Sequence, residues 1–201
     1  FLTGQDAPVS VLADALYQKI PPSRTDNSEE LPGQGRKMLN FTDSRQNAAF
    51  FAPYLERAHE RNLRRRMITY TLQKDPDASK GKLTLRDLLD RLIFRTKKEN
   101  LFPKETDAEL EKHMAIWLMQ EFSPLDRRIS LEGLGLIHFT PIIPSNWQAP
   151  SFMTSAPWGL NNQQAFVLIR FLLDTLRYQG AITFLLDEKI DLYKNEAFAP
   201  R

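Results

Sequence analysis

The chain of 201 residues contains no cysteine. This excludes disulfide bonds, thiolate zinc sites and cysteine nucleophiles, and it fits a reducing compartment, so we expect a cytoplasmic protein. The three histidines, His59, His113 and His138, lie far apart in the sequence, and neither an HxxxH nor an HExxH spacing is present. We therefore expect no metal site.

Long apolar runs are also missing. The longest apolar stretch, near Phe166 to Leu173, is interrupted by Arg170 and falls short of the roughly 18 apolar residues of a membrane-spanning helix. No signal peptide is recognisable. We therefore expect no membrane partner.

The motifs of a complete enzyme are absent as well. The sequence has no G-x-x-x-x-G-K-[ST] phosphate loop, no D-E-x-H magnesium motif and no G-x-S-x-G nucleophile elbow. The glycines of 33–37 are too closely spaced for a phosphate loop and precede the nearest predicted strand. We therefore assign no catalytic residue and no cofactor to this chain by itself.

What is present is enough apolar sequence for a core, at 42%, and a net charge of only +2. Nucleic-acid binding would therefore have to come from a local basic patch. The chain begins at Phe1 without an initiator methionine, and it ends at Arg201 without a polar tail. We expect it to be a piece of a larger protein.

Apolar spacing and helix caps predict mainly helices. They are expected over 8–19, from the polar turn at 42–46 to about 72, after Thr84, after Thr106 and after Asn161 or Asn162. Short strands are expected at 38–41, 136–139 and 181–186. The fold class is thus mainly α with a few short strands (α+β). A helical turn, a glycine and a strand at 131–139, repeated near 180, are typical of winged-helix modules, while an irregular α-rich domain is the plainer alternative.

The most informative segment is Lys37 to Gln46, where a predicted strand ends in a polar turn that opens a helix. The hydroxyls of Thr42 and Ser44 and the first N–H groups of the helix can bind phosphate oxygens. Arg45 adds a charge-assisted contact, and Gln46 belongs to the same turn. This predicts a contact to a nucleic-acid backbone. The alternative is a capped helix start with a solvated arginine.

A second basic feature follows on the same predicted helix. Arg57, Arg61 and Arg64 share one helical face and Arg65 adjoins it; we call these four residues the arginine ridge. Such a ridge can follow phosphates. The alternative is a solvated outer face that pairs with acidic side chains of a later helix. Those acids are Glu105, Asp107, Glu109 and Glu111.

Residues 140–160 hold four prolines and three large aromatic side chains, Trp147, Phe152 and Trp158. Aromatic side chains can stack on unpaired bases. However, no lysine or arginine occurs between Arg128 and Arg170. We therefore expect an ordered loop in which the three aromatic side chains are packed inside.

Several segments resemble a known family. Residues 1–4 with 11–17, and 39–52 with the sequence Phe-Thr-Asp-Ser-Arg-Gln at 41–46, are similar to large bacterial DEAD/DEAH-type helicases of superfamily 2. The nearest subgroup has a C-terminal cysteine-bearing domain and includes helicases of phage-defence systems. In that family a segment like 41–46 is motif IV, which ends the first strand of the second RecA-like domain. Residues 125–136, 173–177 and 198–201 are similar to the long insertion of the subgroup.

The resemblance implies that the parent enzyme uses ATP and Mg²⁺ to move along or unwind nucleic acid. Residues 1–52, with the polar loop 22–36, would begin the second RecA-like domain, and 53–201 would form a mostly helical insertion. The ATP-binding domain would precede Phe1, and motifs V and VI would follow Arg201. The implied partners are nucleic acid, most simply DNA bound weakly, and the other helicase domains. The alternative is a structural or protein-interaction insertion without direct nucleic-acid contact.

Overall fold

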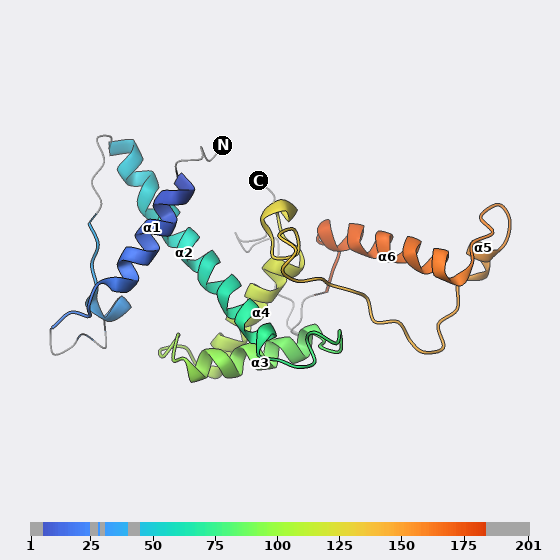
Figure 1. Ribbon diagram of the computed structural model, residues 1–201, viewed down its shortest axis with the longest axis horizontal. Coiled ribbons are helices and arrows are strands. Elements are labelled where there is room, and N and C mark those ends of the chain that lie inside the picture. The colour runs from blue at the N-terminus through green and yellow to red at the C-terminus, as the bar shows by residue number, and fades with distance from the viewer. Residues whose placement is uncertain (1–5, 25–27, 29–30, 40–44, 184–201) are drawn as a thin grey trace. The chain divides into compact units, whose positions relative to one another are not determined.

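The computed structural model of the chain describes residues 6–24, 28, 31–39 and 45–183. Over these residues it is mainly helical, which confirms the expected class at that level (Figure 1). The chain divides into two compact units, Phe1–Arg66 and Met67–Arg201. The division falls inside helix α2, the same helix that contains the sequence-based boundary between residues 52 and 53. None of the helices in the described ranges is long and apolar enough to cross a bilayer.

The first unit contains helix α1 (Asp6–Lys19), the 3-10 helix η2 (Pro32–Gly35) and the first part of α2 (Arg45–Gln73). Buried positions on α1 are Ser10 and Ala13, whereas Leu12 and Leu16, expected on its inner face, are exposed. The polar loop 22–36 is tied back to the end of α1. Its Arg36 donates from Nε to the carbonyl oxygen of Ile20 at 2.7 Å.

Helix α2 runs without interruption through Pro53, which the sequence predicts as a kink or a new start. The proline removes one backbone donor, but a single missing bond does not end a helix of 29 residues. Of the apolar stripe expected along α2, Ala58 and Met67 are buried, and Tyr70 is partly exposed beneath the guanidinium of Arg95.

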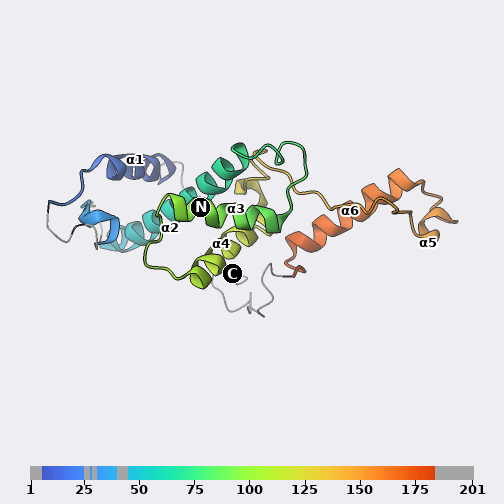
Figure 2. The same ribbon diagram turned by 90° about the horizontal axis from the view of Figure 1, so that it is seen from below.

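The second unit is built around α3 (Leu85–Lys98) and α4 (Asp107–Phe122), which pack side by side (Figure 2). Thr84 and Thr106 cap these helices through the predicted reciprocal bonds to Asp87 and Glu109. The core side chains come mainly from the facing sides of the two helices and from the end of α2. They are Met67, Ile68, Leu88, Leu89, Leu92, Met114, Trp117 and Leu118.

Beyond α4 lie the 3-10 helix η3 (Arg127–Ile129), the short helix α5 (Ser151–Thr154) and helix α6 (Asn162–Tyr178). Asn161 caps α6, as predicted. The face of α6 that the sequence places inward is largely uncovered, since Leu172, Leu173 and Leu176 are exposed.

No strand is present in residues 6–24, 28, 31–39 and 45–183. The strand expected at 136–139 is an extended segment without ladder pairing, and 181–183 are likewise unpaired. A strand requires a partner for its backbone groups, and the described residues offer none. The winged-helix pattern is accordingly not confirmed. Residues 40–41 and 184–186 of the other expected strands lie outside the described residues.

Candidate nucleic-acid interface

The predicted polar turn stands directly before α2, which begins at Arg45 as the cap residues indicate. Thr42 and Ser44 themselves lie outside the described residues. Arg45 and Gln46 form the first turn of the helix, and only their backbone is described. The expected switch to a helix at this position is therefore confirmed, while the phosphate contacts stay a prediction.

The arginine ridge lies on α2 within the first unit. Arg57 is exposed, and Arg61, Arg64 and Arg65 are half-buried. Successive residues of a helix are rotated by about 100°, so the four side chains leave the helix within an arc of roughly 100°. Arg64 and Arg65 each engage another group of the chain. Arg57 is the most accessible member of the ridge, and Arg61 is half-buried like Arg64 and Arg65.

The acidic side chains considered as partners for the ridge have other partners within the second unit. Glu105 is 2.9 Å from Nδ1 of His113, Asp107 is 2.7 Å from Nζ of Lys97, and Glu111 is 3.3 Å from Arg86. Glu109 accepts the backbone N–H of Thr106, and this bond lowers the pKa of its carboxyl group. These contacts account for all four acids locally, so the acidic helix gives no specific support to the pairing alternative.

Within the first unit, α1 is joined to α2 on the side of the helix opposite the ridge, since His59 is rotated by about 200° from Arg57. His59 approaches Asp14 with Nδ1 at 2.5 Å from Oδ1. His59 lies between Arg57 and Arg61 in sequence, so this contact anchors the stretch of α2 that carries these two arginines. The sequence gives no signal for it, because Asp14 and His59 are 45 residues apart.

The second unit contains a buried charged cluster that sequence reasoning missed. Arg177, near the end of α6, is only 4% exposed. Its Nη2 donates to Oε2 of Glu132 at 2.7 Å, to Asp174 at 3.0 Å and to the hydroxyl of Tyr178 at 2.8 Å. Its Nη1 donates to the carbonyl oxygen of Phe122 at 2.9 Å. The guanidinium thus joins the end of α4, the 132–139 segment and α6.

Aromatic rings and a hydroxyl complete this cluster. The Arg177 guanidinium lies 5.1 Å from the ring centre of Phe122, 5.2 Å from Phe139 and 4.3 Å from Tyr178. Ser123 donates to the carbonyl oxygen of Arg177 at 2.7 Å. The guanidinium is paired with carboxylates and surrounded by aromatic rings, and only its Nε atom is buried without a partner. We therefore interpret the cluster as a structural element of the second unit. The only sequence signal is an arginine near the end of a helix rich in apolar residues.

Glu132 is held ionised in this cluster. Burial by itself would raise the pKa of its carboxyl group, but hydrogen bonds from Tyr178, Arg177 and the backbone N–H of Phe139 outweigh burial and lower the pKa. The Oε1 atom also lies 3.2 Å from Nδ1 of His138, and the Nε2 atom of that imidazole contacts Arg170. A neutral imidazole that donates from Nδ1 and accepts at Nε2 satisfies both neighbours.

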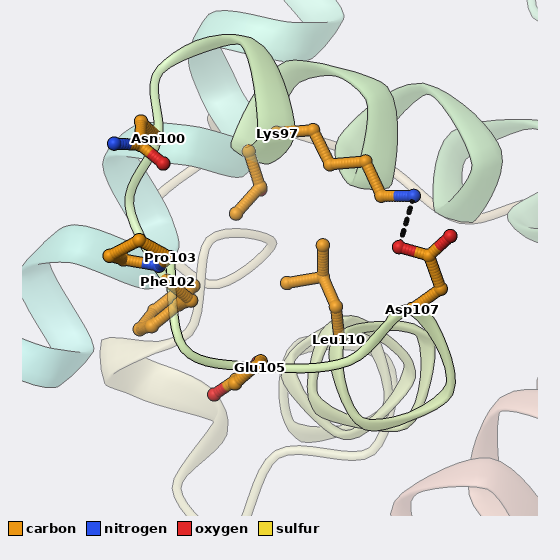
Figure 3. A pocket seen from close by; sticks show the side chains of 8 residues that line it. Lys97, Asn100, Phe102, Pro103, Glu105, Asp107 and Leu110 are labelled. Carbon is orange, nitrogen blue, oxygen red and sulfur yellow. Dashed lines mark ion pairs between the residues drawn. The ribbon is translucent and has the colours of Figure 1, made fainter.

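A small pocket lies between the end of α3 and the start of α4 (Figure 3). Its volume is about 180 Å³, below the roughly 300–1,000 Å³ of sites for small molecules. Lys97 and Asp107, which face each other across it, form an ion pair with each other. The lining side chains are Thr96, Lys97, Asn100, Phe102, Pro103, Glu105, Asp107 and Leu110. The pocket therefore gives no argument for a ligand. In the described ranges no group of three or more His, Asp or Glu side chains is placed to hold a metal ion.

The three aromatic side chains of 140–160 are not all packed, which corrects the expectation for two of them. Trp147 packs edge-on against Phe166 with ring centres 5.7 Å apart. Phe152 and Trp158 are exposed instead. Burial of a loop aromatic requires a facing surface, and the described residues provide one only for Trp147.

No protein-family model, curated protein or solved structure matches this chain. The resemblance to superfamily 2 helicases therefore rests on the sequence motifs alone.

Proposed function

We propose that this chain is the nucleic-acid-facing part of an ATP-dependent helicase, contributes backbone contacts and interdomain packing, and does not hydrolyse ATP by itself. The observation that carries the proposal is the combination of the motif-like segment at 41–46 with the arginines that follow it on one helix. Helix α2 starts where that motif requires a helix, with Arg57 exposed along it and Arg61 half-buried about one turn later.

In this proposal Thr42, Ser44, Arg45 and Gln46 contact phosphates at the start of α2, and the arginine ridge continues the contacts along the helix. Phosphate contacts of this kind position a protein without reading sequence. The residues 38–41 before the turn would pair as a strand in a sheet supplied by other domains of the parent. ATP and Mg²⁺ would bind in those domains, in the cytoplasm, and not in this chain.

A second candidate is a structural or protein-interaction insertion without nucleic-acid contact. The observation that favours it is that Arg64 and Arg65 already engage groups of the chain. The two candidates differ in what they expect of Arg57 and Arg61, which bind phosphates in the first and only solubilise α2 in the second.

Binding of fluorescently labelled single-stranded DNA, followed by anisotropy, tests the proposal. We expect weak binding, at roughly micromolar Kd or above, and a loss of about tenfold or more in the Arg57→Glu/Arg61→Glu variant. Arg64 and Arg65 are left in place because changing them would also disturb their contacts with other groups of the chain. The control is Lys80→Glu/Lys98→Glu, which alters the net charge equally at exposed positions outside α2. Equal losses of DNA affinity in both variants would refute the proposal that the arginine ridge contacts phosphates.

The helicase part of the proposal is tested separately by ATP turnover. The purified chain is expected to show none, and the complete reading frame is expected to encode a phosphate loop upstream. Magnesium-dependent hydrolysis by the purified chain would contradict the proposal even if DNA binding were observed.

A further inference from the structure

Residues 139–169 contain no ionisable side chain, in a chain of which 26% of residues are charged. The segment comprises the extended stretch after His138, the helix α5 with the turn that follows it, and the first half of α6. We call it the uncharged arm. A stretch of this length with no charge differs from an ordinary solvated surface, where charged side chains are common.

The uncharged arm is folded on itself. Trp147 packs on Phe166, and the backbone N–H of Ala149 donates to Oδ1 of Asn162 at 3.1 Å. Helices α5 and α6 contact each other (Figures 1 and 2), and Met153 of α5 and Ala165 of α6 are buried. The arm therefore holds its outward side chains in a defined arrangement.

The outward side chains of the arm are large and apolar. Phe152 is 68% exposed, Trp158 is 63% exposed and Ile142 is 78% exposed. Val167 and, just beyond the arm on α6, Phe171 are exposed as well. Depletion of charge together with exposed Trp and Phe is the composition found at the centre of protein–protein interfaces.

The charge pattern excludes two kinds of partner. A nucleic acid is bound by neutralising phosphates with Lys or Arg, and an anionic bilayer is bound through the same cations. The arm has neither residue. An uncharged protein surface is the partner that matches it.

We propose that the uncharged arm is a homotypic interface, which a second copy of this chain covers. In a two-fold dimer the same patch meets itself, so charges near the axis face charges of the same sign. A patch without charged side chains avoids the electrostatic repulsion between these like charges. This proposal does not depend on the proposed helicase function.

The available area approaches the size that a dimer requires. Fully covered aromatic side chains bury about 150–250 Å² each, so the exposed fractions of Phe152, Trp158 and Phe171 correspond to roughly 300–500 Å². Specific interfaces take about 600–1,000 Å² from each partner. Exposed Ile142 and Val167 of the same arm bring the area toward the lower end of this range.

Sedimentation velocity of the purified chain over a concentration series tests the proposal. We expect a monomer–dimer equilibrium that Phe152→Ser or Trp158→Ser weakens by about 30-fold or more, as truncation of a central interface residue does. The matched control is Phe94→Ser, because Phe94 on α3 has the same 68% exposure and lies outside the arm. Far-ultraviolet circular dichroism establishes that each variant remains helical.

Three results would overturn the proposal. The first is a monomer at every concentration. The second is a dimer that Phe94→Ser weakens as much as Phe152→Ser. The third is binding to neutral phosphatidylcholine vesicles without self-association, which would make the arm a membrane contact.

Discussion

A single carboxylate, that of Glu132, connects separate segments of the second unit. One oxygen accepts from Arg177 and Tyr178 of α6, each at 2.7 Å. The other accepts the backbone N–H of Phe139 at 3.2 Å and lies beside His138. These bonds require the ionised form, because a protonated carboxyl would place a donor against other donors.

Replacing Glu132 by glutamine is expected to destabilise the chain by about 3 kcal/mol, because the buried Arg177 would keep only the more exposed Asp174 as a counter-charge. The effect should depend on pH. Since the pKa of Glu132 is lower in the folded than in the unfolded chain, its contribution is complete above about pH 5 and is lost as the pH falls below about 4. Chemical denaturation at a series of pH values measures this difference.

The control for this experiment is Glu99→Gln, at an exposed position after α3. It should leave the free energy of unfolding nearly unchanged at every pH. If Glu132→Gln also left the free energy of unfolding unchanged at neutral pH, the buried cluster would not stabilise the second unit.

Gly133, the next residue, is required by a close approach of two backbone segments. A Cβ atom at this position would lie 1.8 Å from the carbonyl oxygen of Arg127, and a backbone oxygen cannot rotate away. We expect Gly133→Ala to cost roughly 2 kcal/mol or more. Gly135→Ala is the comparison, since nothing lies within 4 Å of its Cβ and only its positive φ opposes the change. Thermal unfolding should show the larger loss for Gly133→Ala.

At the scale of elements, the helix starts were predictable because their signals are local. Thr84, Thr106 and Asn161 accept hydrogen bonds from backbone N–H groups three residues later. No distant segment takes part in these bonds. Which faces are covered was less predictable. The apolar positions Leu12 of α1 and Leu172 of α6 have the spacing of a buried stripe but are exposed, because burial requires a neighbouring surface that periodicity does not specify.

The cap of α6 gives a prediction at this scale. Asn161→Ala removes the acceptor for the N–H of Gln164, at 2.9 Å, and should lower the free energy of unfolding by about 1 kcal/mol. Asn161→Ser keeps an acceptor and should recover most of that loss. Circular dichroism during urea unfolding compares the three proteins, and an alanine variant as stable as the parent would show that the capping box does not stabilise α6.

At the scale of the whole molecule, the sequence could not predict contacts between distant segments. Glu132 and Arg177 are 45 residues apart, as are Asp14 and His59. Strand pairing has the same non-local character, and the extended residues 136–139 have no partner strand within the described parts of the chain. For the candidate interface, helical spacing placed the arginine ridge on one face of α2, but it did not indicate that Arg64 and Arg65 engage other groups of the chain.

The central claim is that Arg57 and Arg61 of α2 contact nucleic-acid phosphates, and the salt dependence of single-stranded DNA binding tests it most directly. Each phosphate contact contributes about −0.7 to the slope of log K against log salt concentration. The account predicts that Arg57→Glu/Arg61→Glu makes the slope less steep by about 1.4, while Lys80→Glu/Lys98→Glu leaves it unchanged. A slope that is the same in the parent chain and in the arginine variant would contradict the account.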